Sequence, residues 1–96
     1  MKVTVKGYWI FSRFLDYESG IEIEVDEATL KETLSILASK LGGEFDRLLF
    51  DIDSKKVKRS NLILLNGQNY LNLTRKMHTP LKDGDQIELV PMVTGG

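Results

Sequence analysis

The sequence contains no cysteine and only one histidine among its 96 residues. The lack of cysteine excludes disulfides, thiolate metal sites and cysteine nucleophiles, and it is typical of proteins from a reducing cytoplasm. The sequence also lacks a glycine-rich phosphate loop, a Ser/His/Asp set and a carboxylate pair of the kind used in acid–base catalysis. We therefore find no catalytic or metal-binding motif within the chain.

Neither sign of charge predominates, because 13 lysines and arginines accompany 14 aspartates and glutamates, for a formal net charge of -1. This balance provides no field for a polyanion, which argues against nucleic acid as the main partner. The apolar runs are much shorter than the roughly 20 residues of a membrane span, and the start alternates instead of forming a signal-peptide core. We expect one cytoplasmic domain with no membrane partner.

Alternation of apolar and polar residues, or a short apolar run, predicts the strands of this chain. In the first, Trp9 and Phe11 are expected to face inward with the valines before them. Asn66-Gly67 is a strong hairpin signal, because both residues tolerate a positive φ. The predicted strands are residues 2–11, 21–25, 62–65, 69–73 and 86–90.

One helix is predicted after the second strand. Thr29 and Glu32 have the T-x-x-E spacing of a capping box, in which each side chain accepts a hydrogen bond from the other's backbone N–H. A stripe of apolar residues with helical spacing follows, and Gly42 supplies a left-handed stop. The stripe consists of Leu30, Leu34, Leu37, Ala38 and Leu41.

Two further segments connect these elements. Residues 12–20 are rich in polar turn formers and are interpreted as a simple connection. Residues 44–52 have apolar residues spaced as in a short helical turn or an irregular core segment, the last of them Ile52. With one helix to cover one face of the sheet, the order of elements predicts a two-layer α+β domain, whose sheet is mixed if the last strand pairs in parallel with the first.

Two glycines close the sequence, where glycine stabilises neither a strand nor a helix. We interpret residues 1–90 as the folded domain and residues 91–96 as an extended C-terminal Gly-Gly tail, able to reach roughly 20 Å at about 3.3 Å per residue. The tail has no charged side chain, so it can enter a groove on another protein at little desolvation cost. Its residues are Pro91, Met92, Val93, Thr94, Gly95 and Gly96.

The reactive group expected in this tail is the α-carboxylate of Gly96. With a pKa of about 3.5 it is ionised at neutral pH and is a poor electrophile. Adenylation by ATP converts it to an acyl phosphate that a sulfur or nitrogen nucleophile can open. Gly95 and Gly96 leave room for an enzyme around the reacting carbon, because neither has a Cβ. The alternative is a chance Gly-Gly ending, expected roughly once in 200 chains at the average glycine frequency.

The order of strands and helix, the Asn66-Gly67 turn, PLKDGD (80–85) and the closing P-x-V-T-G-G resemble the MoaD/ThiS sulfur carriers, in particular the small subunit of molybdopterin synthase. The resemblance covers nearly the whole chain. It implies the β-grasp fold shared with ubiquitin, an α+β fold in which a mixed sheet of four to five strands packs against one main helix. The sequence departs from the family where Met92 replaces a second proline and in the basic segment 53–61.

The resemblance implies a sulfur carrier that is not catalytic on its own. An E1-like adenylating enzyme, using ATP and Mg²⁺, would activate Gly96, and a sulfur donor would convert it to a thiocarboxylate. The tail would then enter the larger subunit of molybdopterin synthase and donate sulfur to a cyclic pyranopterin, on the way to the molybdenum or tungsten cofactor. The carrier itself is expected to bind no cofactor and no metal.

Three alternatives share part of this evidence. In a ubiquitin-like protein modifier, lysine amines replace sulfur as the nucleophile after the same activation. A sulfur carrier for thiamine or tRNA thiolation would differ only in the acceptor. A non-covalent β-grasp interaction module would carry its terminal glycines incidentally.

Some side chains outside the tail are candidates for partner contacts. Tyr8 and Ile10 lie on the outer side of the predicted first strand and form a possible partner surface, unless residues 45–52 cover them. The basic segment 53–61 is interpreted as a solvated loop, with docking of an anionic partner as the alternative. His78 is interpreted as a surface turn residue.

Overall fold

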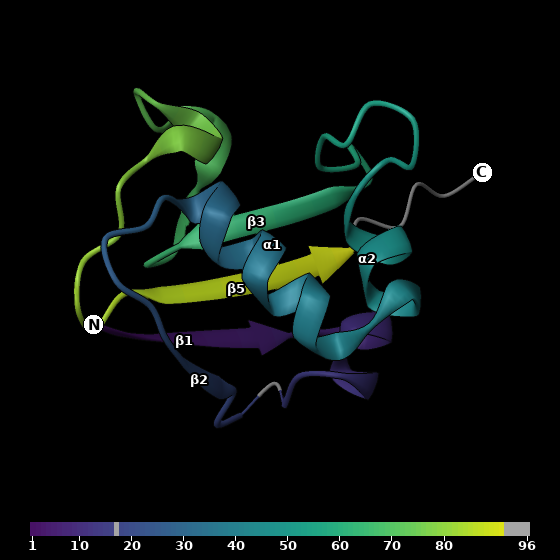
Figure 1. Ribbon diagram of the computed structural model, residues 1–96, viewed down its shortest axis with the longest axis horizontal. Coiled ribbons are helices and arrows are strands. Elements are labelled where there is room, and N and C mark those ends of the chain that lie inside the picture. Colours follow the sequence, from purple (N-terminus) through teal and green to yellow (C-terminus); the bar gives the residue numbers. More distant parts are fainter. Residues whose placement is uncertain (17, 92–96) are drawn as a thin grey trace.

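A five-stranded mixed sheet forms one layer of the fold in the computed structural model, which describes residues 1–16 and 18–91 (Figure 1). The strands lie in the order β2-β1-β5-β3-β4; β1 and β5 pair in parallel, and the other neighbours are antiparallel. They are β1 (Lys2–Gly7), β2 (Ile21–Glu24), β3 (Asn61–Leu65), β4 (Gln68–Asn69) and β5 (Gln86–Pro91). The predicted mixed sheet is therefore confirmed, with the first and last strands at its centre.

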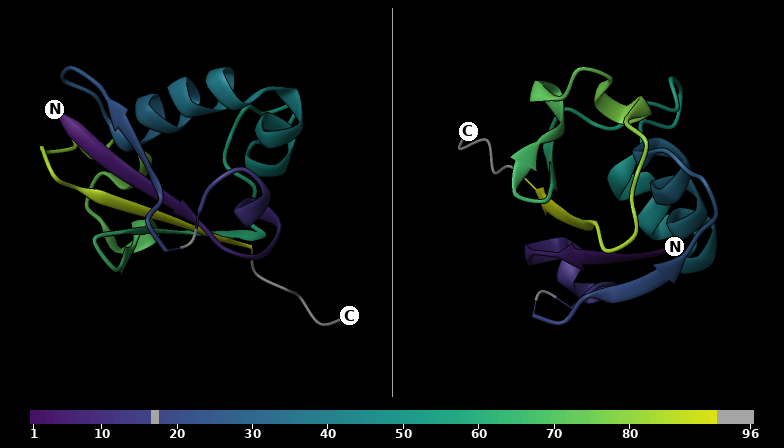
Figure 2. Two further views of the ribbon diagram at one scale, coloured as in Figure 1. Left: turned by 90° about the horizontal axis from the view of Figure 1, so that it is seen from below. Right: turned by 90° about the vertical axis from the view of Figure 1, so that its left-hand side faces the viewer.

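Helix α1 (Leu30–Leu41) lies across one face of this sheet and forms the second layer (Figures 1 and 2). Its capping box is confirmed: Glu32 N donates to Thr29 Oγ1 at 3.1 Å, and Thr29 N donates to Glu32 Oε1 at 3.0 Å. The helix ends at Gly42, whose φ of 103° is the left-handed stop that the sequence predicts. A shorter helix, α2 (Gly43–Leu49), follows directly.

The core lies between the helices and the sheet. In the central strands, buried Val3 and Val5 of β1 and Ile87 and Leu89 of β5 alternate with more exposed residues. Because successive strand residues point to opposite faces, the alternation assigns the buried set to the α1 side of the sheet and the exposed set to its outer face. Both helices contribute buried apolar residues to the same cluster, among them Leu34.

The two predicted turns are confirmed. Asn66 and Gly67 have φ angles of 51° and 83° and join β3 to β4. In the turn before β5, Gly84 has a φ of 88°, Asp83 Oδ1 accepts a hydrogen bond from Lys2 N at 2.7 Å, and Asp85 Oδ2 accepts one from Lys82 N at 2.7 Å. Asp85 Oδ1 also accepts from Asn66 Nδ2 at 2.9 Å, which ties the two turns together.

The first strand is shorter than predicted. It ends at Gly7, and a 3-10 helix, η1 (Trp9–Arg13), replaces its second half. Trp9 is 62% exposed rather than inward, because its φ of 55° turns the chain out of the strand. Phe11 is buried as predicted, although it reaches the core from η1. A Cβ on Gly7 would lie 2.7 Å from the Cβ of Phe11, so the fold-back requires glycine there.

Three smaller predictions are also corrected. The segment 12–20 is more than a polar connection, because Leu15 is fully buried. Ile52 is 67% exposed and lies beyond the end of α2 instead of filling the core. The return strand predicted at 69–73 shrinks to β4, because Asn69 Oδ1 accepts a hydrogen bond from Leu71 N at 2.9 Å and starts a 3-10 turn, η2 (Tyr70–Asn72).

Candidate functional site

The site predicted from the sequence begins at the end of β5. Pro91 is the last residue of this strand, is half-buried, and lies opposite Asn61 of β3. The structure therefore locates the point from which the predicted tail starts. The arm and the predicted reactive residue lie outside the described residues; these are Met92, Val93, Thr94, Gly95 and Gly96.

Asn61 stabilises the structure next to Pro91, and its role was not predicted from the sequence. Its side chain is buried, and its Nδ2 donates to Leu48 O at 2.9 Å and to Leu49 O at 3.3 Å. These bonds join the C-terminal end of α2 to the start of β3, beside Pro91. The only sequence signal was a lone asparagine immediately before an apolar run.

On the other side of β5, η1 lies beside the strand end (Figure 2). Tyr8 N donates to Leu89 O at 3.0 Å, which fixes the start of η1 against β5. Trp9 and Ile10, which are 62% and 41% exposed, follow directly. Residues 45–52 therefore do not cover Ile10, which was the alternative to a partner surface. The role of Tyr8 and Ile10 as a partner surface stays a prediction.

Phe45 of α2 covers the inner side of η1 instead. Its ring packs edge to face on Phe11 and Phe14, with ring centroids 5.8 Å and 5.5 Å apart. An exposed ion pair between Arg13 and Glu44, at 3.2 Å, joins the same two elements. The aromatic cluster holds η1 in place from inside and leaves its outer side exposed.

Tyr8 is only half-buried and has a defined partner. Its hydroxyl donates to Glu88 Oε2 at 2.5 Å. This hydrogen bond raises the pKa of Tyr8, and partial burial and the negative charge of Glu88 raise it further. The phenol is thereby held as a hydrogen-bond donor to Glu88.

A row of half-buried apolar residues crosses the outer face of the sheet beside the strand end. Leu62 pairs with Val90 across β3 and β5, and both alternate with buried neighbours. Leu64 follows Leu62 by two residues, so it lies on the same side of β3, opposite Glu88. These three residues form a surface together with Tyr8, and we call it the outer-face row. It is apolar apart from the Tyr8–Glu88 hydrogen bond.

The described residues show where the predicted tail begins and which side chains surround that point. Within residues 1–16 and 18–91, no three His, Cys, Asp or Glu side chains are grouped so that they could hold a metal ion. In the same part of the chain, no helix is long and apolar enough to cross a membrane.

Comparison with known families gives a match over most of the chain. The model of the ThiS family matches residues 13–96, which begins at the last residue of η1 and includes the whole sheet after β1 and both terminal glycines. The sequence matches none of the curated proteins with which it was compared.

Solved structures share the fold over the whole chain. The HVO 2177 protein of Haloferax volcanii is 30% identical, with a TM-score of 0.74 over 100% of this chain and 87% of that one. A subunit in the complex of subunits 1 and 2 of the molybdopterin-converting factor from Helicobacter pylori is 28% identical, with a TM-score of 0.59 over 100% of both chains. The small archaeal modifier protein 1 of Methanosarcina acetivorans is 24% identical, with a TM-score of 0.80 over 99% of this chain and 96% of that one. These structures place the chain among β-grasp proteins.

Proposed function

The chain belongs to the ThiS family of ubiquitin-like sulfur carriers, and we propose that it is the sulfur-donating small subunit of a molybdopterin synthase, with Gly96 as its reactive residue. The observation that carries this proposal is that the family match continues through Gly96. The likeness over the full chain to a subunit of a molybdopterin-converting factor supports the choice of acceptor.

In the proposed reaction a carboxylate oxygen of Gly96 attacks the α-phosphorus of ATP, and pyrophosphate leaves. A hydrosulfide equivalent from the sulfur donor then attacks the acyl carbon, AMP leaves, and the thiocarboxylate remains. An E1-like adenylating enzyme with Mg²⁺ supplies the catalytic groups for these steps. The carrier contributes the backbone of Gly95 and Gly96, which has no Cβ to obstruct the approach to the carbon.

The exposed surface around the strand end supports the second half of the proposal. Trp9 and Ile10 project beside the end of β5, and the outer-face row adjoins them. A partner that docks there buries apolar area while the tail, reaching roughly 20 Å from Pro91, extends into its active site. The larger synthase subunit is the proposed partner.

The test is to incubate the protein with ATP, Mg²⁺, a set of candidate adenylating enzymes and a sulfur donor, and to measure its intact mass. We expect one oxygen to be exchanged for sulfur at Gly96. A variant with one residue added after Gly96 should acquire no sulfur, while its melting temperature stays unchanged. If no adenylating enzyme in the set produces the exchange, or if the added residue does not prevent it, the proposal is wrong.

The acceptor is tested with the thiocarboxylated protein. Mixed with a molybdopterin synthase large subunit and cyclic pyranopterin phosphate, it should lose its sulfur to the pterin in a single turnover. Parallel reactions with a thiazole synthase and with a tRNA-thiolating enzyme should leave the thiocarboxylate intact. Transfer in either of those reactions alone would assign the carrier to thiamine or tRNA thiolation instead.

A protein modifier is the second candidate, because the fold is shared with a small archaeal modifier protein and the adenylate can also be opened by an amine. A lysine ε-amine would attack the same acyl carbon, AMP would leave, and an isopeptide bond would form. Mass spectrometry of cellular proteins should then find lysines joined to Gly96.

A further inference from the structure

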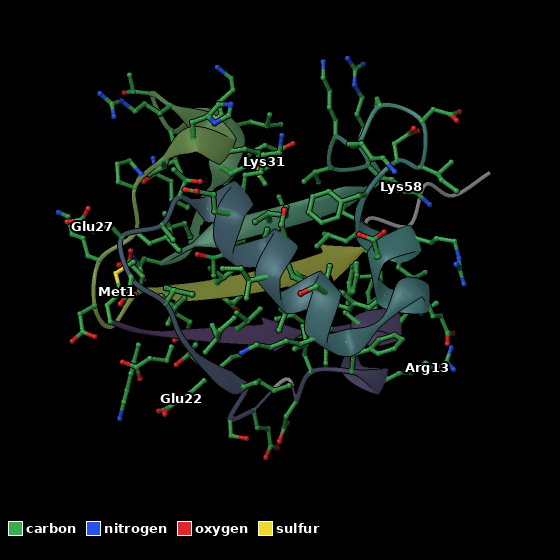
Figure 3. All side chains as sticks on the ribbon, viewed as in Figure 1. Met1, Arg13, Glu22, Glu27, Lys31 and Lys58 are labelled. Carbon is green, nitrogen blue, oxygen red and sulfur yellow. The ribbon has the colours of Figure 1, made fainter. Side chains whose placement is uncertain are left out.

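A hollow lies away from the end of β5, on the β3–β4 side of the molecule. It has a volume of about 360 Å³ and lies between the first turn of α1, residues 50–59 and the segment that contains η2 and a further 3-10 turn, η3 (Lys76–His78). Figure 1 shows these two segments standing on the same side of α1, and Figure 3 shows Lys31 between them. We call this hollow the basic pocket.

The floor of the basic pocket is apolar. It is made by Phe50, Val57, Tyr70, Leu71 and Met77. Leu71 is 54% exposed, one of the most exposed large hydrophobic residues described, whereas the ring of Phe50 is buried. An aliphatic side chain placed against Leu71 would therefore bury apolar surface that the fold alone leaves exposed to water.

The rim of the basic pocket is cationic. Its charged and titratable members are Lys31, Lys56, Arg59, Lys76 and His78, and no aspartate or glutamate lines it. In a chain with a net charge of -1 this is a local concentration of positive charge. The ion pairs found among the described residues join Met1 to Glu24 and Arg13 to Glu44, so the pocket lysines and Arg59 have no ion-pair partner there.

Both walls of the pocket are held by hydrogen bonds. On one side, Asp51 Oδ1 accepts from Asp53 N and Ser54 N at 2.9 Å and 3.0 Å, and Asp51 N donates to Lys56 O at 2.7 Å. The backbone bonds from Ser54 and Asp53 lower the pKa of Asp51 and keep it an acceptor at neutral pH. Because the 51–56 turn is fixed in this way, the pocket exists before a ligand binds.

The other wall is a chain of 3-10 turns. Leu73 N donates to Tyr70 O at 3.1 Å, and His78 N donates to Arg75 O at 2.8 Å. These turns carry two of the apolar residues that line the pocket: Leu71, which is exposed, and Met77, which is half-buried between exposed Lys76 and His78. The carboxylate of Glu32, in the first turn of α1, is already engaged by Thr29 in the capping box.

We propose that the basic pocket binds an acidic peptide segment of a partner protein, with an aliphatic side chain on the floor and flanking carboxylates on the rim. Charge complementarity selects the occupant, because four permanent cations surround one apolar floor. A nucleic acid would leave this floor unused, since the floor offers no fully exposed aromatic ring for a base to stack on. The inference does not rest on the proposed function.

The elements that form the basic pocket differ from those beside the chain end. Trp9 and Ile10 belong to η1, whereas the pocket is built by α1, residues 50–59 and the η2–η3 segment. A peptide bound in the pocket would therefore leave η1 free. One partner could hold the domain through the pocket while another enzyme acts at Gly96.

The test uses the full chain, immobilised, and a pooled synthetic library of hexapeptides that carry two central aliphatic residues flanked by aspartate or glutamate. We expect enrichment of such peptides over the matched library with asparagine and glutamine in place of the acids. NMR of the ¹⁵N-labelled protein with the best binder should show shifts at residues 31, 56–59 and 70–78. Failure to enrich any acidic peptide, or shifts confined to other residues, would overturn the proposal.

Two variants and a control test whether peptide binding depends on the pocket or only on the net charge of the protein. The double variant Lys56→Glu, Arg59→Glu should weaken binding of the best peptide by about tenfold or more, because like charges then meet at the rim. Leu71→Ser should weaken binding of the same peptide without unfolding the protein, since Leu71 is 54% exposed. The control, Arg47→Glu with Lys82→Glu, changes the net charge equally on exposed residues outside the pocket and should bind normally.

An oligonucleotide of equal charge provides the final comparison. If single-stranded RNA shifts the same resonances more strongly than the peptide, the pocket is a nucleic-acid site and the proposal is wrong. If the control variant loses binding as completely as the Lys56→Glu, Arg59→Glu variant, the attraction is that of the whole molecule and not of the pocket.

Discussion

Asn61 shows how one buried polar side chain can organise the place where a functional segment begins. Its amide reaches the carbonyls of Leu48 and Leu49 and so fixes the end of α2 against the first residue of β3, opposite Pro91. Buried carbonyls of this kind need a donor, because leaving them without one costs about 1–3 kcal/mol each. The last residue of β5 thus lies opposite a residue 30 positions earlier in the chain (91 against 61).

Replacing Asn61 by alanine should lower the free energy of unfolding by about 1–3 kcal/mol, because Leu48 O loses its donor, whereas Leu49 O still accepts from Lys58 N at 3.0 Å. Urea denaturation followed by circular dichroism measures the change. Asn72→Ala is the matched control, because Asn72 is exposed and lies at the end of η2. Equal losses in the two variants would show that the Asn61 hydrogen bonds contribute nothing.

At the scale of elements, α1 was predictable because its signals are local. The Thr29–Glu32 spacing, the apolar stripe and Gly42 all lie within the helix or next to it, and the structure contains each feature where it was expected. The chain after β1 was not predictable in this way. Its alternation continues to Phe11, but a positive φ at Trp9 and the contact between Gly7 and Phe11 replace the strand by η1.

The capping box makes α1 sensitive to acid. The backbone hydrogen bond from Thr29 N and the side-chain bond of Thr29 lower the pKa of Glu32 below its ordinary value of 4.5. A carboxyl whose pKa is depressed by folding stabilises the folded state above its ordinary pKa, and the contribution is lost as the pH falls through the folded value. The contribution of Glu32 should therefore be complete above its ordinary pKa of 4.5 and be lost as the pH falls from there through the lower pKa of the folded state.

Glu32→Gln isolates this effect, because glutamine keeps the reciprocal hydrogen bond but does not titrate. Thermal unfolding of both proteins from pH 7 to pH 3 should show that the wild-type protein loses more stability than the variant over the acid part of this range. The pKa values of Asp16 and Asp51 are also lowered by backbone hydrogen bonds, and they titrate equally in both proteins. Parallel curves at all pH values would contradict the role of the ionised cap.

At the scale of the whole molecule, β1 and β5 pair in parallel, so the first and last strands lie side by side within the sheet. The chemistry of the tail rests on six residues in a row and stays a prediction, because residues 92–96 lie outside the described part of the chain. The surface beside Pro91 was predicted only in part, at Tyr8 and Ile10. Trp9, Asn61 and Val90 come from three separate strands or turns, and only the tertiary fold brings them next to Pro91. Sequence patterns predicted the elements and left their neighbours undetermined.

The same topology predicts an uneven stability across the sheet. Amides of β1 and β5 should exchange with solvent most slowly, since opening either strand disrupts two neighbours and the core beneath. Amides of β4, an edge strand of two residues, should exchange fastest among the strands. Native-state hydrogen exchange measured by NMR checks this order, and protection of β4 equal to that of β5 would contradict it.

Trp9 gives the molecule a built-in optical probe. It is the only tryptophan in the chain, it is 62% exposed, and it stands beside the strand from which the tail extends. A protein that covers this region would shift its fluorescence to shorter wavelength without any attached dye. Unfolding, by contrast, would change the surroundings of this indole very little, because most of it is already exposed to water. The emission of Trp9 therefore reports the binding of a partner and not folding.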